Sequence, residues 1–296
     1  MKRVFIATVS ILLLSIVATS AALPKGRFAE DEKIKIWSNK SAPHSNNYEG
    51  ELRENTTNLI GNITEAELLI YKPKGENRGD KAVVICPGGG YSILSMMNEG
   101  QRIAEWFAEN GITAAVVVYR LPNGVCEVPS EDVVEAMRIM RKRASKLGFD
   151  PQKLGVVGFS AGGHLAATVS TLPADEAKPN FSVLFYPVIS SEKGLAHEGS
   201  FNNLLGKDRT AEESAEYSLD RRVDETTPPA ILFHCNDDKT VKPVNSTLYY
   251  NALSRYQRHA ALYIFPEGRH GWGNKDSFEY QSMWQSLLLD WIEKLD

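Results

Sequence analysis

A serine set among small residues lies in the stretch GVVGFSAGGH, residues 155–164. The apolar start of this stretch is typical of a buried strand, and the glycines beside Ser160 permit a turn too tight for larger side chains. In the motif Gly-x-Ser-x-Gly, such a turn lifts the serine hydroxyl above the end of a strand, where it can attack a carbonyl carbon. The motif is short and arises by chance, so an ordinary strand-to-helix turn is the alternative interpretation.

The rest of the chain supplies the partners that a reactive serine needs. A base must take the hydroxyl proton and a carboxylate must orient the base; after a serine elbow, the usual chain order is Asp or Glu, then His. Asp237 and Asp238 follow the apolar run AILFHC, and His270 lies in EGRHGWG after the run ALYIFP. We predict that Ser160, Asp238 and His270 act together, with Asp237 as the alternative carboxylate. Two solvated loop carboxylates are the competing interpretation.

The other five histidines are weaker candidates for the base. His44 lies in a polar N-terminal region, His197 in a polar insertion and His259 in a connection before a strand. His234 lies within an apolar strand, where a hydrogen-bonded core histidine is expected. His164 lies one helical turn after Ser160, below the hydroxyl, so we expect it to pack rather than to react.

Acyl transfer also needs N–H groups that stabilise the negative oxygen of the intermediate. One is the backbone N–H of Ala161, the residue after the serine. The second is expected from the glycine-rich stretch VVICPGGGYS, residues 83–92, because glycines let a backbone approach a substrate closely. A plain turn and a phosphate cradle are the alternatives, and the cradle lacks its Gly-Lys-Ser/Thr signature.

Positioning these residues requires alternating strands and helices. Strands are predicted at residues 66–71, 81–86, 114–119, 154–159, 182–187, 230–235 and 261–266, and helices at 98–110, 130–147, 161–171, 244–257 and 277–294. Strands that are apolar on nearly every residue indicate a mostly parallel sheet covered on both faces. The predicted fold class is α/β, a doubly wound, mostly parallel sheet with helices on both faces.

Three regions are expected along the chain. Residues 1–22 have Lys2 and Arg3, then an apolar run and small residues, which predicts a secretory signal peptide. Residues 23–62 are polar and predict an N-terminal arm, and residues 63–296 predict one catalytic domain. The polar stretch 187–229 is a long insertion between two strands, expected to form a cap or part of a binding wall.

Charge, the predicted signal and the cysteines limit the classes of partner and cofactor that are expected. The net charge is −4 and no stretch gathers lysines and arginines, so a nucleic-acid partner is not expected. The signal predicts a secreted or periplasmic protein without a membrane span once the signal is removed. Cys86, Cys126 and Cys235 are too scattered for a metal cluster, and buried free thiols are expected at Cys86 and Cys235. No metal or cofactor is predicted.

Taken together, the motifs resemble a known family. PGGGY, GFSAGGHLAA, TPPAILFHCNDDKTVKPVNS and GRHGWG, in this order, are similar to the α/β-hydrolase serine esterases, and most similar to the secreted bacterial acetylxylan-esterase-like group. The resemblance implies a triad of Ser160, Asp238 and His270, with Gly89, Gly90 and Ala161 lining the oxyanion hole. Two departures are Pro87, where many relatives have His before the glycines, and Lys242, where relatives often have Pro.

The resemblance implies hydrolysis of short acyl esters, acetyl above all, on a small ester or an acetylated plant polysaccharide such as xylan. Tyr91 and Trp272 are the predicted stacking surfaces for a sugar, although each is equally an ordinary packing residue. A lipase or general carboxylesterase, a peptidase of the same fold, and a catalytically inactive carbohydrate-binding relative are the alternatives.

Overall fold

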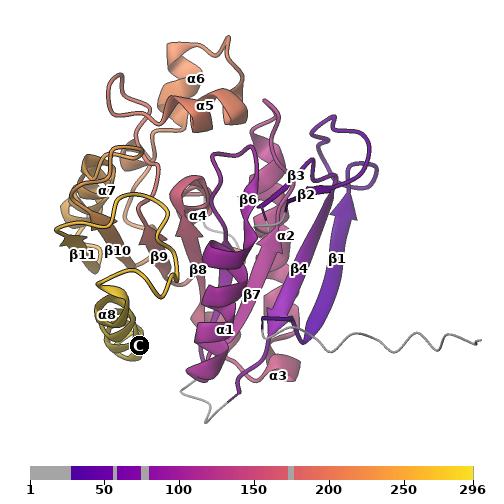
Figure 1. Ribbon diagram of the computed structural model, residues 1–296, viewed down its shortest axis with the longest axis vertical. Helices are drawn as coiled ribbons and strands as arrows, with labels where there is room; N and C mark the ends of the chain where they lie inside the picture. Colours follow the sequence, from indigo (N-terminus) through magenta and orange to yellow (C-terminus); the bar gives the residue numbers. More distant parts are fainter. Residues whose placement is uncertain (1–27, 56–58, 75–79, 173–176, 296) are drawn as a thin grey trace, which may run out of the picture.

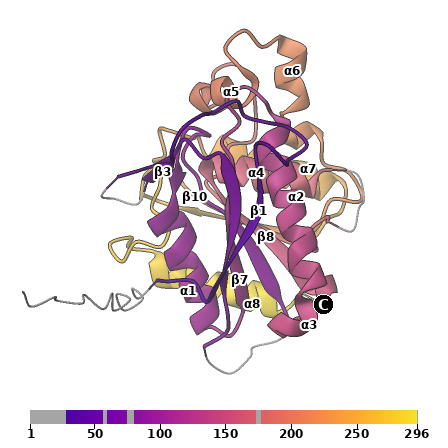
Figure 2. The same cartoon turned by 90° about the vertical axis from the view of Figure 1, so that its right-hand side faces the viewer.

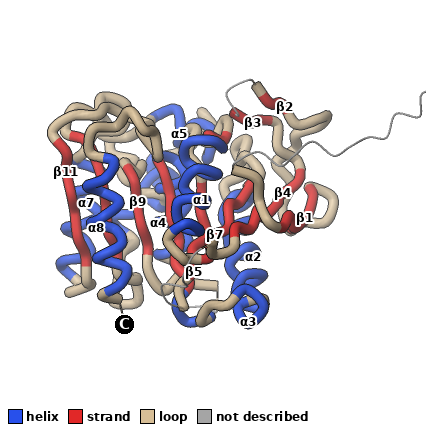
Figure 3. Tube along the Cα trace, turned by 60° about the horizontal axis from the view of Figure 1, so that its bottom comes forward, coloured by secondary structure: helices blue, strands red, loops and turns tan. Residues whose placement is uncertain are grey.

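Eight strands form one sheet in the order β1-β4-β7-β5-β8-β9-β10-β11, in a computed structural model that describes residues 28–55, 59–74, 80–172 and 177–295. The strands β1 and β4 and the strands β4 and β7 pair antiparallel, and the other neighbours pair parallel. Figure 3 shows this order running from β11 at one edge to β1 at the other. The sheet strands are β1 (Glu32–Ser38), β4 (Glu65–Tyr71), β5 (Ala82–Cys86), β7 (Thr113–Val118), β8 (Leu154–Phe159), β9 (Ser182–Phe185), β10 (Ala230–Cys235) and β11 (Ala260–Phe265).

Helices cover both faces of this sheet, as predicted. Figure 2 shows α1 and α2 on opposite faces, and Trp106 of α1 packs on Trp284 of α8, with ring centroids 5.1 Å apart. The α-helices are α1 (Arg102–Glu109), α2 (Glu127–Lys142), α3 (Ala144–Leu147), α4 (Ser160–Ser170), α5 (Glu198–Leu205), α6 (Ala211–Glu216), α7 (Val244–Arg255) and α8 (Gln281–Glu293). Three short segments add a π-helical turn, η1 (Met97–Gln101), and the 3₁₀ turns η2 (Pro151–Lys153) and η3 (Leu219–Arg221). None of the described helices combines the length and apolarity needed to cross a bilayer.

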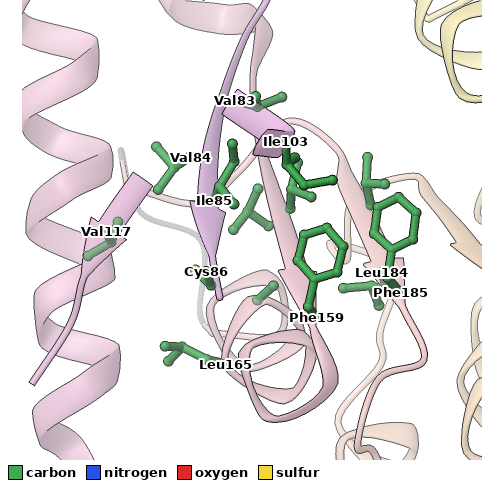
Figure 4. Close-up of a cluster of buried hydrophobic side chains, with 14 of the residues drawn as sticks. Val83, Val84, Ile85, Cys86, Ile103, Val117, Phe159, Leu165, Leu184 and Phe185 are labelled. Atoms are coloured by element: carbon green, nitrogen blue, oxygen red, sulfur yellow. The ribbon is translucent and has the colours of Figure 1, made fainter. Parts of the chain in front are cut away.

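The core lies where the central strands meet the helices. Strands β5 and β8 are buried along their whole length, and the Phe159 and Phe185 rings stack with centroids 4.5 Å apart (Figure 4). Each fully buried side chain of this size stabilises the fold by about 1.5–3 kcal/mol. The three cysteines are free thiols, and Cys86 and Cys235 are buried, as predicted. A rigid core therefore holds the ends of β5 and β8.

The N-terminal region is more than an arm. Its residues Glu32–Ser38 form β1, an edge strand of the main sheet, and β2 (Arg53–Glu54) and β3 (Leu59–Gly61) form a small sheet with β6 (Leu94–Ser95). The alternation of Lys33 and Lys35 with Ile34 and Ile36 suits an edge strand, because exposed lysines hinder pairing with another chain. The predicted signal peptide, residues 1–22, lies outside the described residues.

The insertion 187–229 carries α5 and α6, which lie together at one end of the molecule, away from α3 and α8 (Figure 1). Val188 and Phe201 of the insertion pack with Val241, which lies just after β10. The insertion, which follows β9, therefore packs on the loop that follows β10.

Candidate active site

The turn at Ser160 is built as a tight elbow between β8 and α4. Ser160 has φ +52°, in the left-handed region that side chains larger than glycine rarely adopt. A Cβ at Gly162 would lie 2.1 Å from the Cys86 carbonyl oxygen, and one at Gly158 would lie 2.3 Å from the Gly162 carbonyl oxygen. Both glycines are therefore required by close approach of the backbone, and the strain is held by the buried strand beneath it.

Loops after three different strands converge on the Ser160 hydroxyl. The His270 ring, in the loop after β11, places Nε2 2.8 Å from Ser160 Oγ. Its other nitrogen, Nδ1, lies 2.6 Å from Oδ2 of Asp238, which follows β10. The structure thus brings Ser160, His270 and Asp238 into one hydrogen-bonded chain, although the serine and histidine are 110 residues apart in sequence.

The two neighbouring aspartates have different partners. Asp238 is buried and its Oδ1 accepts hydrogen bonds from the N–H groups of Thr240 at 2.9 Å and Val241 at 3.0 Å. Asp237 is half-buried, and its Oδ1 accepts from the Arg269 N–H at 2.8 Å. Asp238 is therefore the carboxylate on His270, while Asp237 holds the backbone of the loop that carries it.

Two histidines keep Asp238 ionised. Burial alone would raise the pKa of Asp238, but hydrogen bonds from His234 and His270 outweigh it and hold that pKa well below the usual range. His234 is a buried core histidine, as predicted, and its Nε2 lies 2.9 Å from the Val241 carbonyl oxygen and 3.3 Å from Asp238 Oδ2. Sequence reasoning expected a hydrogen-bonded core histidine here but did not identify its contact with the carboxylate.

The glycine loop after β5 approaches Ser160 closely. A Cβ at Gly88 would lie 3.0 Å from the Ser160 Cβ, and Gly89 and Gly90 have φ values of +135° and +64°. No described residue accepts a hydrogen bond from the N–H of Gly89 or Gly90, whereas the Gly88 N–H donates to Glu99. Ala161 is the second residue of α4, so its N–H has no acceptor within the helix. These N–H groups remain available for an incoming oxygen.

Both aromatic residues predicted to stack on a sugar are buried instead. Tyr91 is only 2% exposed, and its hydroxyl lies 3.0 Å from Nδ1 of His164 beneath the elbow. Trp272 is 3% exposed and stacks on Phe278 at 4.2 Å between ring centroids. Tyr91 is therefore part of the core, whereas Trp272, although nearly buried, is one of the residues that line the cavity beside His270. His164 packs, as predicted.

The insertion 187–229, called the cap below, places His197 beside the glycine loop. Sequence reasoning did not choose this histidine as the base. The His197 Cε1 lies 3.9 Å from the position of a Cβ on Gly90, and Asn203 of α5 donates to the Gly90 carbonyl oxygen at 2.8 Å. The His197 Nδ1 accepts from the Ser200 N–H, so the neutral ring carries its proton on Nε2. Burial and the nearby His270 lower the pKa of His197, which favours that neutral form.

One cavity borders His270. Its volume is about 450 Å³, and it is lined by His270, Trp272 and charged residues of the histidine loop, among them Arg269 and Lys275. Another of about 680 Å³ is lined by Ser92 and Ile93, just after the glycine loop, and by Asn, Glu and Arg side chains of the N-terminal region. In the described part of the chain, no group of three or more His, Cys, Asp or Glu side chains is arranged to hold a metal ion.

A family model of the alpha/beta hydrolase fold matches residues 83–260, which is more than half of the chain and includes the glycine loop, Ser160 and Asp238. The chain belongs to the α/β-hydrolase family. The predicted fold class and the resemblance to this family are thereby confirmed.

Proteins similar to this α/β hydrolase are named as esterases or glycoside-degrading enzymes. An acetylxylan esterase of Xylanibacter ruminicola is 38% identical over 235 residues, covering 78% of this chain and 48% of the relative. Endo-1,4-beta-xylanase B of Butyrivibrio fibrisolvens is 33% identical over 219 residues, covering 69% and 34%. The chain thus spans less than half the length of these two curated relatives.

A solved structure matches over nearly all of its length. The acetyl ester-xyloside bifunctional hydrolase from Caldicellulosiruptor lactoaceticus superposes with a TM-score of 0.74 at 31% identity, covering 93% of this chain and 98% of that one. The comparisons agree with the prediction of a hydrolytic enzyme of the esterase type.

Proposed function

We propose that this α/β hydrolase cleaves carboxylic esters through an acyl-enzyme on Ser160. The observation that carries the proposal is the hydrogen-bonded chain from Ser160 Oγ through His270 to Asp238, beside backbone N–H groups that have no acceptor among the described residues. That combination supplies a nucleophile, its base and a site for the negative oxygen.

In the first step, Ser160 Oγ attacks the ester carbonyl carbon while His270 Nε2 takes the hydroxyl proton. The carbonyl oxygen becomes negative and is held by N–H groups of Ala161 and the Gly89–Gly90 loop. Asp238 holds the His270 proton on Nδ1, so that Nε2 is free to accept, and stabilises the imidazolium that forms. The C–O bond to the alcohol then breaks, and Nε2 returns the proton to the leaving oxygen.

In the second step, water attacks the acyl-enzyme. His270 Nε2 takes a proton from the water, the bond between Ser160 Oγ and the acyl carbon breaks, and Nε2 gives the proton back to Oγ. The products are the alcohol and the acid, and the enzyme returns to its starting state.

The substrate class we propose is acetyl esters on plant polysaccharide such as xylan. Relatives named for acetylxylan and acetyl ester-xyloside hydrolysis support it, as do the charged residues that line the cavity beside His270. The carbonyl oxygen of an acetyl group is bound by the oxyanion N–H groups and needs no further donor. The His197 Nε2–H would therefore donate a hydrogen bond to an oxygen of the sugar. Export through the signal peptide at residues 1–22 would bring the enzyme to such a polymer.

Turnover of p-nitrophenyl acetate tests the catalytic proposal. We expect Ser160→Ala to reduce kcat by about 10⁴-fold or more, since a triad works as a unit. Ser170→Ala is the matched control, because Ser170 lies in the same helix and its hydroxyl bonds only the Ala166 carbonyl oxygen. Undiminished turnover in Ser160→Ala would overturn the proposal.

Acetate release from acetylated xylan, beside release of acid from triglyceride and from longer acyl esters, tests the substrate class. We expect acetate release to dominate, and His197→Ala to raise KM for acetylated xylan with little effect on p-nitrophenyl acetate. Preference for long acyl chains would contradict the acetyl assignment and favour a lipase or general carboxylesterase.

A further inference from the structure

A buried carboxylate outside the triad lies between two loops of the site. Glu99, in the π-helical turn η1, is 4% exposed. Its Oε2 accepts from the Gly88 N–H at 2.9 Å, and its Oε1 lies 2.8 Å from the Tyr186 hydroxyl. π-Helical turns cost helix regularity and are frequent at functional sites. Nothing in the triad mechanism described above uses this side chain.

The groups around Glu99 can all donate to it. The Gly88 N–H can only donate, so Oε2 accepts. The Gly273 N–H donates to the Tyr186 hydroxyl oxygen at 2.9 Å, which leaves the Tyr186 O–H free to donate to Oε1. This arrangement accommodates an ionised carboxylate. Burial raises the pKa of Glu99 above its usual value, and the Tyr186 hydrogen bond and the nearby His270 offset only part of that rise.

The same contacts join the glycine loop to the histidine loop. Gly88 directly precedes the two glycines whose N–H groups face the site, and Gly273 lies three residues after His270. The Tyr186 ring packs edge-on against the His270 ring, with centroids 4.7 Å apart. A Cβ on Gly273 would lie 2.6 Å from the Asn98 carbonyl oxygen, so η1 and the histidine loop are in backbone contact.

We propose that Glu99 is a positioning residue that fixes the oxyanion loop through Gly88 and the catalytic histidine through Tyr186, and that its charge stabilises the His270 imidazolium formed during acyl transfer. The inference rests on the proposed esterase function. Pro87, which directly precedes the glycines, has no side-chain hydrogen-bonding group and no N–H, so it cannot itself hold the glycine loop. Asp238 and Glu99 then act on His270 from two different elements.

The charged and titratable groups around His270 come from several elements. Asp238 follows β10, Glu99 lies in η1, Tyr186 follows β9, and His197 belongs to the insertion. The charged residues that line the cavity beside His270 are Asp237, Glu267, Arg269, Lys275 and Glu279. His270 must be neutral to take the Ser160 proton, and an adjacent anion favours its protonated form. Removing the Glu99 charge should therefore move the acidic limb of kcat/KM to lower pH.

Glu99→Gln keeps the size of the side chain and removes its charge. We expect kcat for p-nitrophenyl acetate to fall by about 10²-fold with KM little changed, and the acidic limb to move to lower pH. Glu105→Gln is the matched control: Glu105 is a similarly buried glutamate in α1, paired with Lys74 at 2.6 Å and remote from the site. It should leave both the rate and the limb unchanged.

Tyr186→Phe tests the link from Glu99 to the catalytic histidine. Because it keeps the aromatic ring, it tests the inference even if Glu99→Gln folds poorly. It should lower kcat by about 10-fold, and the loss in the double variant should be smaller than the product of the two single losses, because the two residues share the Tyr186–Glu99 hydrogen bond. Wild-type kcat in Tyr186→Phe, or an unmoved acidic limb in a folded Glu99→Gln, would overturn the inference.

Amide hydrogen exchange separates this inference from the proposed function. Peptides covering residues 83–95 and 266–276 should exchange faster in Glu99→Gln than in Glu105→Gln, whatever the turnover. Unchanged exchange would overturn the positioning role of Glu99 even if the enzyme were an active esterase. Absent turnover in the wild type with faster exchange in Glu99→Gln would instead count against the esterase proposal alone.

Discussion

Ser160 and Asp238 obtain their properties from the backbone around them. The left-handed conformation of Ser160 is held by glycines that admit no Cβ, and two backbone N–H groups together with two histidines keep Asp238 ionised. A carboxylate held in this way presents its second oxygen to His270 in one fixed direction. Such pre-organisation is the condition for a base that acts without rearrangement.

The carboxylate pair gives a residue-level prediction. Asp238→Asn should lower kcat by about 10³–10⁴-fold, because an amide at this position permits the wrong tautomer of His270. Asp237→Asn should cost less than about 10-fold, since Asp237 contacts only the Arg269 N–H of the histidine loop. Steady-state kinetics on p-nitrophenyl acetate measures both. Equal losses in the two variants would contradict the assignment of Asp238.

Sequence patterns were sufficient for some of these residues and insufficient for others. Ser160, Asp238 and His270 each follow a strongly apolar strand, so their chain order and flanking glycines are visible in the sequence. Glu99 lies in MMNEGQ, a stretch without a motif, and reaches the site only because η1 folds beneath the glycine loop. Tyr91 and Trp272 were predicted to stack on a sugar and are buried in the structure, because an aromatic side chain beside a site can face either the ligand or the core.

At the scale of elements, a hydrogen bond joins helix α5 of the cap to the glycine loop. Asn203 of α5 accepts from the Gly124 N–H through its backbone at 2.9 Å and donates from its side chain to the Gly90 carbonyl oxygen at 2.8 Å. The insertion therefore contacts the loop whose N–H groups face the substrate. The sequence predicted a cap or binding wall here because the stretch between the two strands is long. Helix α5 and its hydrogen bond to Gly90 can be seen only in the folded structure.

Removing that link should affect catalysis. We expect Asn203→Ala to lower kcat/KM by about 2- to 10-fold, the cost of one neutral hydrogen bond that holds the loop. Asn202→Ala is the matched control, because the neighbouring Asn202 contacts Arg209 instead. If the two variants showed the same kcat/KM, the hydrogen bond from Asn203 to the glycine loop would have no catalytic role.

At the scale of the whole molecule, a buried arginine that pairs with Asp132 also joins the N-terminal region to the sheet. Arg120 and Asp132 are fully buried with Nη2 and Oδ1 2.6 Å apart. Arg120 Nη1 also donates to the His44 carbonyl oxygen at 2.6 Å, and its guanidinium lies 5.9 Å from the Trp37 ring centroid. The prediction of a polar surface arm missed this link, because a single arginine after a strand carries no pattern that identifies its partner.

Breaking this pair should destabilise the fold. Arg120→Met should lower the free energy of unfolding by about 3–5 kcal/mol, since it leaves Asp132 buried without its cation. Lys35→Met, which removes an exposed pair with Glu65, should change it by less than about 1 kcal/mol. Urea titrations measure both; a small effect of Arg120→Met would mean that the N-terminal region is held by other contacts.

Labelling with a fluorophosphonate tests the central claim most directly, because this reagent modifies only a serine whose hydroxyl is activated. Peptide mapping by mass spectrometry should find one adduct, on Ser160, in the wild type, and His270→Ala should label at least about 10²-fold more slowly. An unlabelled wild type, an adduct on another serine, or equal labelling in His270→Ala would contradict the account.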